Sequence, residues 1–316
     1  MDDVQLPLSN KTPGEELLYF WGIGDLHYYT PPQWRTYQAQ RFAPMFRDLR
    51  ALWTREGTPA FCVSPGDIVE TSAPENYQLA RQELTMQLGD IPFYPGLGNH
   101  ELWAEHEDED DGLDHYIANY STFWGKPTHY YWIEGEVLCV MLDPIGYPEP
   151  RFSEGTLAFL KMALAKHPAH IAIIFAHCPL YNTVGDRDPE RKRDYDSLMP
   201  LFFIQNSDQV HEILAKHGNG CLFISGHTHS GWQAPNLVYT EQAGKHAVTY
   251  INLMSPWYTG YEKGPERNAD QSSFQFYFDE PDLIMSFAFH VYRNYIIVHL
   301  RNHREGTWMA RWRVPL

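Results

Sequence analysis

The sequence predicts an α/β fold in which helices pack against buried β-sheets. Short apolar runs alternate with longer stretches whose apolar residues recur at the helical period. Several of the apolar runs end in Asp, Asn or His, which is typical of parallel strands that end beside a functional site. The chain shows no Gly-, Ser- or Pro-rich linker and no internal repeat. We therefore expect a single domain over residues 1–316, with its motifs within about 17–256 and a C-terminal β-hairpin extension over about 257–316.

The first part of the chain reads as strands that alternate with helices. Apolar runs predict three strands: residues 17–23, 59–65 and 91–97. Helical spacing of apolar residues predicts a helix over 33–56, in which Pro44 indicates either a kink or two shorter helices. A second helix is predicted over 75–88, with Gly89 as its C-cap.

The rest of the chain continues the alternation. Apolar runs predict five more strands: residues 130–133, 137–142, 171–176, 221–225 and 247–253. Helices are predicted over 153–165, with an N-cap serine at its first residue, and over 207–217. Residues 181–197 are charged and irregular, which favours a surface loop, and residues 287–314 show the alternation typical of hairpins.

The composition is that of an acidic globular protein. Hydrophobic residues make up 43% of the chain, and 24 Lys and Arg face 40 Asp and Glu, for a formal charge of -16. Such a charge disfavours a general nucleic-acid or anionic-membrane binder, because polyanion affinity depends on phosphate neutralisation. Much of the acidic surplus lies in residues 105–114 (EHEDEDDGLD), whose spacing does not match an EF-hand. We expect a solvated loop there.

Cysteine usage and the N-terminal sequence bear on the compartment. The four cysteines show no CxxC spacing, so neither a zinc ribbon nor a disulfide framework is indicated. The N-terminus is acidic and lacks an apolar core, and no run reaches the length of a membrane span. We expect a cytoplasmic protein with no membrane partner, and the sequence says nothing of its oligomeric state.

Five apolar runs are followed by side chains that can bind metal ions. In chain order these are Asp25 and His27, Asp67, Asn99 and His100, His177, and His227 with His229. Residues i and i+2 of an extended segment project to one side, so each Asp-x-His or His-x-His pair can reach one ion. An imidazole such as that of His100 can ligate, donate or shuttle a proton.

The number of donors exceeds the needs of one ion. Outside His100 there are two carboxylates, four imidazoles and one amide, which suits two adjacent divalent ions that share a carboxylate. Mixed nitrogen and oxygen donors without a thiolate favour Mn, Fe or Zn over calcium. The sequence therefore predicts a metal site at the tips of several strands.

Five motifs resemble those of the calcineurin-like metallophosphoesterase family: GDLH (24–27), GDIVE (66–70), GNHE (98–101), AHCP (176–179) and GHTH (226–229). The resemblance implies a metallophosphoesterase-type β-sandwich of two mixed sheets flanked by helices, with a dinuclear centre at the C-terminal tips of strands. It implies one metal ion held by Asp25, His27 and His229, and another held by Asn99, His177 and His227. Asp67 then bridges the two ions, which are divalent or of mixed valence. His100 faces the substrate phosphate.

The resemblance also implies a reaction. It is metal-dependent hydrolysis of a small phosphomonoester or phosphodiester by a hydroxide that bridges two metal ions, with His100 as acid or charge stabiliser. Val69 and Glu70 stand where purple acid phosphatases carry a tyrosine ligand, so the broader phosphoesterase branch is favoured. A nuclease of the same family, a protein phosphatase and a non-catalytic metal-binding scaffold remain alternatives.

Residues beside the motifs have two interpretations each. Glu101 either supports the ligands or begins a helix. Five aromatic residues next to the motifs either line the cleft or pack in the core: Tyr28, Tyr29, Trp103, Trp257 and Tyr258.

Overall fold

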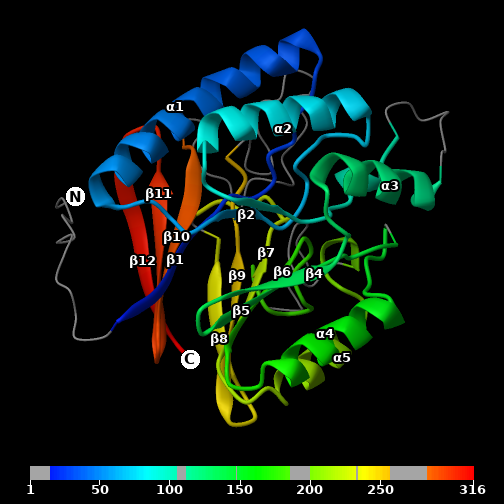
Figure 1. Cartoon of the computed structure of the whole chain (residues 1–316), viewed down its shortest axis with the longest axis vertical. Coiled ribbons are helices and arrows are strands. Elements are labelled where there is room, and N and C mark those ends of the chain that lie inside the picture. Colours follow the sequence, from blue (N-terminus) through cyan, green and yellow to red (C-terminus); the bar gives the residue numbers. More distant parts are fainter. Residues whose placement is uncertain (1–14, 105–111, 147, 186–199, 233, 257–282) are drawn as a thin grey trace.

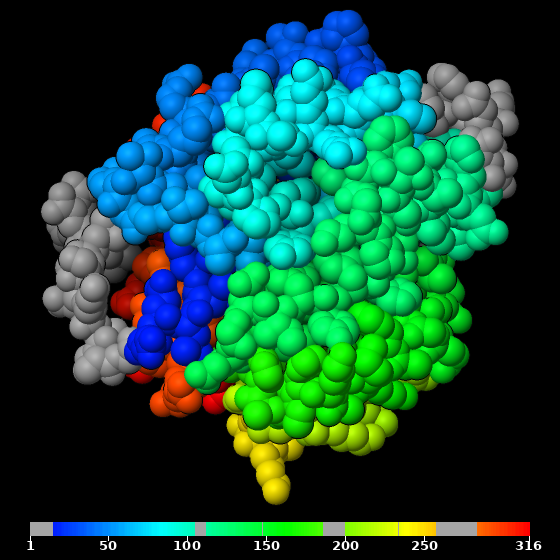
Figure 2. All heavy atoms as spheres, in the orientation of Figure 1, coloured from blue at the N-terminus to red at the C-terminus, as the bar shows by residue number. Residues whose placement is uncertain are grey.

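Two mixed β-sheets lie face to face, and helices cover their outer faces (Figure 1). The structure is a computed structural model. It describes residues 15–104, 112–146, 148–185, 200–232, 234–256 and 283–316. The space-filling view shows the helices of the first half packed closely over the top of the molecule (Figure 2).

Each sheet has six strands within the described residues. The strands of the first sheet are β1 (Glu16–Gly22), β2 (Cys62–Ser64), β3 (Phe93–Pro95), β10 (Met285–Tyr292), β11 (Tyr295–Asn302) and β12 (Thr307–Pro315). The strands of the second sheet are β4 (Tyr130–Glu134), β5 (Val137–Leu142), β6 (Ile171–Ala176), β7 (Cys221–Ser225), β8 (Val238–Ala243) and β9 (His246–Asn252). The α-helices are α1 (Pro32–Glu56), α2 (Pro74–Leu88), α3 (Leu113–Trp124), α4 (Glu154–Lys166) and α5 (Ser207–Leu214).

Both sheets combine parallel and antiparallel pairs. The order is β12-β11-β10-β1-β2-β3 in the first sheet and β4-β5-β6-β7-β9-β8 in the second. Strands β1, β2 and β3 are parallel to one another, as are β5, β6, β7 and β9. The predicted fold class, two mixed sheets flanked by helices, is confirmed.

The core forms three layers of apolar contacts, one between the sheets and one under each pair of helices. Strand β5 shows how the sequence builds them: Val137, Cys139 and Met141 join the layer between the sheets. Leu138, Val140 and Leu142 join the layer that includes residues of α4 and α5. Because both faces of β5 are buried, the strand reads as a continuous apolar run.

Helix α1 is one helix of 25 residues that includes Pro44. The alternative of two shorter helices is therefore wrong. An interior proline costs about 3 kcal/mol because it removes one hydrogen bond and crowds the preceding turn. Apolar residues on both sides of Pro44, such as Phe42 and Met45, are buried in the core cluster shared with β1 and α2. That burial offsets the cost.

Several elements differ from the sequence predictions. Helix α3 and strand β8 were not predicted, and α3 begins at Leu113, inside the segment expected as an acidic loop. The rest of that segment, residues 105–111, lies outside the described residues, as do most of the predicted loop 181–197 and residues 257–282. The C-terminal strands extend the first sheet, where β10 pairs antiparallel with β1. No helix in the described part of the chain is long and apolar enough to cross a membrane.

Candidate metal centre

The C-terminal ends of five strands meet at one edge of the two sheets. Strands β1, β2 and β3 contribute the loops with Asp25 and His27, Asp67, and Asn99, while β6 and β7 contribute His177, His227 and His229. All seven predicted ligands therefore come together, six of them buried and Asn99 half-buried. A hydrogen bond joins the loops of the two sheets here, since the His227 N–H, after β7, donates to Asp25 Oδ1, after β1, at 2.9 Å.

A first cluster contains Asp25, His27, Asp67 and His229, with one ligand atom of each within 4.8 Å of the others. The Nε2 atoms of His27 and His229 are 3.0 Å apart. Asp25 Oδ1 lies 3.7 Å from His229 Nε2, and Asp67 Oδ2 lies 3.9 Å from His27 Nε2. These atoms converge on one point.

A second cluster contains Asp67, His177 and His227. The Nε2 atom of His177 lies 3.0 Å from Asp67 Oδ2, 3.0 Å from His227 Nδ1 and 3.1 Å from Asn99 Oδ1. A single ring nitrogen cannot form good hydrogen bonds with all three neighbours at once. Asp67 belongs to both clusters, so its carboxylate is common to the two.

Polar contacts at the outer side of two histidines, an ion pair for His27 and a hydrogen bond for His227, favour one tautomer of each. His27 Nδ1 lies 2.8 Å from Glu70 Oε2, and His227 Nε2 lies 3.0 Å from the Leu201 carbonyl. Since carboxylate and carbonyl oxygens accept, those nitrogens carry the hydrogen. The lone pairs of His27 Nε2 and His227 Nδ1 therefore face the clusters, as metal ligation requires. Sequence reasoning missed the contact of Glu70, although this residue belongs to the GDIVE motif.

The loops that carry the ligands adopt an unusual backbone conformation. Five non-glycine residues of the two clusters have φ between 29° and 70°: Asp25, His27, Asp67, His227 and His229. Such residues are strained by about 1–3 kcal/mol each and persist where the surroundings over-determine them. Gly98 shows how tight these surroundings are, since a Cβ there would lie 2.2 Å from Asp67 Oδ1.

Glu101 holds two of these loops in place. Its fully buried carboxylate accepts hydrogen bonds from the N–H groups of Asp67 (2.9 Å), Ile68 (2.7 Å), Val69 (3.1 Å) and Gly98 (2.6 Å). It also lies in the short 3₁₀ turn His100–Leu102. Glu101 thus binds backbone amides and supports the loops after β2 and β3, which carry Asp67 and Asn99.

The carboxylates and imidazoles of the centre shift one another's pKa. Burial raises the pKa of Asp25 to about 7, although the nearby His177 opposes the rise. Burial also disfavours the charged form of Asp67, but the imidazoles, His177 first, hold the pKa of Asp67 well below its usual range. Burial lowers the pKa of His177, but the surrounding carboxylates, Asp67 first, together outweigh it and raise that pKa to about 9. Asp67 and His177 thus stabilise each other's charged forms.

The residues fit bound metal ions. Asp25 Oδ2 is fully buried and has no hydrogen-bond partner among the described residues. An orphaned buried carboxylate oxygen is costly unless a cation or donor reaches it. The donor set consists of carboxylate and amide oxygens and imidazole nitrogens with no thiolate, which suits Mn, Fe or Zn.

His100 lies beside both clusters, and one of its ring nitrogens is bonded to the backbone. Its Nδ1 lies 2.8 Å from the Glu70 carbonyl, so Nδ1 carries a hydrogen, and its Nε2 lies 3.9 Å from Asp67 Oδ2. The free nitrogen therefore faces the centre. Tyr28, one of the aromatic residues considered for the cleft, is fully buried in the core, whereas Trp103 is half-buried against His100. Trp257 and Tyr258 lie outside the described residues.

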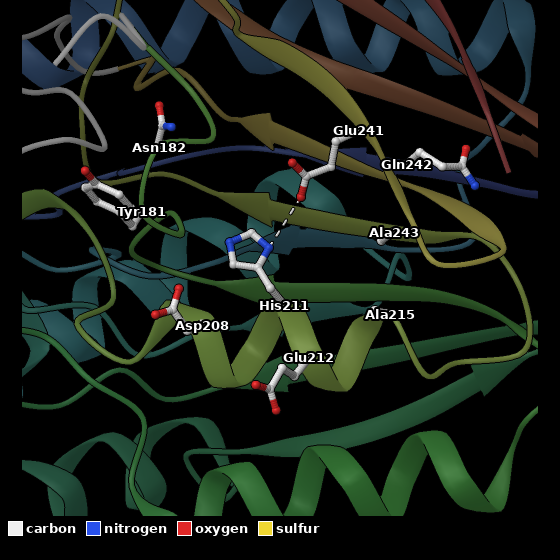
Figure 3. Close-up of a pocket in the computed structure, with 9 residues that line it drawn as sticks. All are labelled: Tyr181, Asn182, Asp208, His211, Glu212, Ala215, Glu241, Gln242 and Ala243. Atoms are coloured by element: carbon white, nitrogen blue, oxygen red, sulfur yellow. Dashed lines mark ion pairs between the residues drawn. The ribbon is translucent and has the colours of Figure 1, made fainter.

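A surface hollow lies away from the candidate metal centre, between α5 and β8 (Figure 3). Its volume is about 680 Å³, and its lining includes Asp208, His211, Glu212 and Glu241. None of the seven predicted ligands lines it. A small apolar slot does adjoin the centre and is lined by residues that include Asn99, Leu102, Leu201 and His227. We therefore place the candidate site at the strand tips, where the metal-binding side chains lie, and not in the hollow.

Comparison with known proteins bears on the family of the chain and not on the roles of single residues. A protein-family model described as calcineurin-like phosphoesterase matches residues 18–231, well over half of the chain. The chain belongs to this family. This phosphoesterase is therefore a hydrolase that cleaves phosphoester bonds with the help of metal ions. A search of curated proteins finds no significant match.

Solved structures share the fold of this phosphoesterase at low sequence identity. GAP50, the anchor in the inner membrane complex of Plasmodium, is 14% identical with a TM-score of 0.52, over 96% of this chain and 90% of that one. PhoD is 11% identical with a TM-score of 0.54, over 95% of this chain and 69% of that one. At such identities the likeness shows the fold alone.

Proposed function

We propose that this phosphoesterase hydrolyses a small phosphomonoester or phosphodiester at a centre of two metal ions. The observation that carries the proposal is the pair of buried clusters that share Asp67. Asp25, His27 and His229 would hold one ion and Asn99, His177 and His227 the other. The donor set favours divalent or mixed-valence Mn, Fe or Zn. When bound, the ions would supply an activated water and offset negative charge on the phosphoryl oxygens.

We propose that His100 protonates the leaving group. Because its Nδ1–H is bonded to the Glu70 carbonyl, the protonated ring has its second N–H, on Nε2, directed toward the centre. As the water oxygen bonds to phosphorus, the bond from phosphorus to the ester oxygen breaks, and the Nε2 proton passes to that ester oxygen. The water loses a proton to solvent, so the products are an alcohol and a phosphate. General acid catalysis of this kind contributes about 10²- to 10⁴-fold.

The rest of the chain favours a small substrate. The formal charge of -16 repels a polyanion such as DNA, whereas a single phosphate ester can be held by the local charge of bound ions. The four cysteines are all free and buried, which is consistent with the cytoplasm as the proposed compartment. A nuclease and a scaffold are the alternatives to be tested.

A substrate panel with matched histidine variants tests this function. Nitrophenyl phosphate monoesters and diesters, alkyl phosphates and single- and double-stranded DNA are each assayed with Mn, Fe or Zn. We expect the small esters to be hydrolysed. His100→Ala should lower the turnover of alkyl esters at least about 100-fold. His115→Ala, at an exposed histidine of α3, should match the wild type.

The other results are equally informative. Preferred cleavage of DNA would support the nuclease. A protein that binds its ions but turns over no phosphate ester would support the scaffold and contradict the proposal.

A further inference from the structure

The indole of Trp103 packs on the imidazole of His100. The ring centroids are 3.9 Å apart, and the planes are tilted by 43°. His27 contacts the same imidazole edge-on, with centroids 4.5 Å apart and an interplanar angle of 90°. The ring proposed to donate the proton is therefore held between a proposed metal ligand and a tryptophan.

The backbone around Trp103 is fixed from two sides. The Ser72 N–H donates to the Trp103 carbonyl at 2.8 Å, and the Trp103 N–H donates to the His100 carbonyl at 3.3 Å. Trp103 is the C-cap residue of the short 3₁₀ turn that contains His100. Because Ser72 and Glu70 follow β2, one loop holds both the backbone of Trp103 and the Nδ1 atom of His100.

A single hydrogen bond does not fix the plane of an imidazole. The bond from His100 Nδ1 to the Glu70 carbonyl leaves the ring free to swing about the Nδ1–O direction. A flat aromatic surface against the imidazole restricts that swing and holds Nε2 toward the centre. An error of about 1 Å in such a position can cost about 100-fold in rate.

Trp103 and its neighbour Leu102 have different surroundings. The preceding residue, Leu102, packs against the core cluster of α1 and α2. Trp103 belongs to none of the three core clusters of the described residues and is half-buried. Its indole contacts the imidazole of His100.

We propose that Trp103 is a positioning residue for His100 and thereby determines which phosphate esters are cleaved efficiently. The inference rests on the proposed role of His100 as proton donor. Esters with a poor leaving group, such as an alkyl alcohol, need the proton, whereas nitrophenyl esters release a stable anion without it. Trp103 should therefore matter for alkyl esters and little for nitrophenyl esters.

A double-mutant cycle on two substrates tests this inference. Turnover of an alkyl ester and a nitrophenyl ester of the same phosphate class is measured for Trp103→Ala, Trp103→Phe, His100→Ala and the double variant, each with its metal content. We expect Trp103→Ala to lose about 10-fold on the alkyl ester and less than about 3-fold on the nitrophenyl ester, because only the first needs the positioned proton. Trp103→Phe should recover most of the loss. The double variant should equal His100→Ala, since Trp103 acts through His100.

Two results would overturn the inference: an equal loss on both esters, or a further loss when Trp103→Ala is added to His100→Ala. If His100→Ala itself shows no dependence on the leaving group, the proposed acid role of His100 fails instead. If Trp103→Ala does not fold, Trp103→Leu, which keeps apolar bulk without the ring, is read in the same way.

A readout without turnover makes the test independent of activity. The indole should shift the NMR signals of the His100 ring protons upfield, and Trp103→Ala should remove this shift while Leu102→Ala retains it. Unchanged His100 signals in Trp103→Ala would show that the contact is absent and would overturn the inference.

Discussion

The Nδ1 atom of His27 lies 2.8 Å from Oε2 of Glu70, so a carboxylate orients a proposed metal ligand. The His27 side chain is fully buried, and Glu70 reaches its Nδ1 from the loop after β2. This contact keeps the hydrogen on Nδ1 and leaves the Nε2 lone pair for the ion.

Glu70→Ala should weaken metal binding about 10- to 100-fold, because removal of the partner frees the tautomer and the orientation of His27. Glu70→Gln keeps an acceptor oxygen and should lose less. Metal titration followed by calorimetry measures both affinities. Glu154→Ala, at an exposed glutamate in the first turn of α4, is the control. Equal affinities for Glu70→Ala and the control would contradict this role.

Variants of Asp25 and of Asp67 should differ in the number of bound metal ions that they lose. Asp67 belongs to both clusters, whereas Asp25 belongs to one. Asp67→Asn should therefore lower the affinity for both ions, and Asp25→Asn should leave the second cluster with its ion. Elemental analysis after dialysis at a fixed free metal concentration measures the content per chain. If Asp25→Asn lost both ions and Asp67→Asn only one, the assignment of the shared ligand would be wrong.

That the seven candidate ligands come together could be predicted because their positions depend on local sequence. Each ligand follows an apolar run within a few residues, and the ends of parallel strands meet at one edge of a sheet. Once the strands are recognised, the seven candidate ligands from Asp25 to His229 are therefore expected at the same edge of the sheets. The roles of Glu70 and Glu101 were less accessible, since their contacts depend on side-chain directions within loops that have positive φ.

The missed elements show where local patterns fail. Strand β8 is mostly half-exposed and carries Thr240 and Glu241, so no apolar run marks it. The position of β10 beside β1 joins residues more than 260 apart in the sequence, for example Phe20 and Phe289, which local spacing does not encode. Helix α1 continued through Pro44 because tertiary burial outweighed a local signal.

Glu101→Gln should destabilise the protein by about 2–4 kcal/mol. The buried carboxylate accepts four backbone hydrogen bonds, and an amide would replace one acceptor oxygen with an N–H group that faces donors. Urea unfolding of the metal-free protein measures the free energy of unfolding. Glu75→Gln, at an exposed position in α2, should change it by less than about 0.5 kcal/mol. A loss for Glu101→Gln as small as that of the control would show that these bonds contribute little.

Asp48 should make the stability depend on pH below about 4. Burial disfavours its charged form, but the hydrogen bonds from Arg301 and His303 outweigh it and lower the pKa of Asp48 from 3.8 to about 2. Because the folded-state pKa is the lower one, the stabilisation is present above pH 3.8 and is lost as the pH falls through about 2. After allowance for solvent screening, about 1 kcal/mol of stability should be lost in this window.

The free energy of unfolding of the wild type and Asp48→Asn, measured between pH 6 and 2, checks this window. The difference between the two proteins should be largest above pH 4 and should shrink by about 1 kcal/mol toward pH 2. Asp90→Asn, at an exposed aspartate, is the matched control. A difference that stays constant with pH would show that the charge of Asp48 is not stabilising.

The central claim is that two buried clusters sharing Asp67 hold the ions on which phosphoester hydrolysis depends. Its most direct test is turnover of a nitrophenyl phosphate ester by metal-free protein as divalent ions are added back, with the bound ions counted in the same samples. The structure predicts negligible turnover without metal and a plateau at two bound ions per chain. Full turnover by the metal-free protein, or a plateau reached with one bound ion per chain, would contradict the claim.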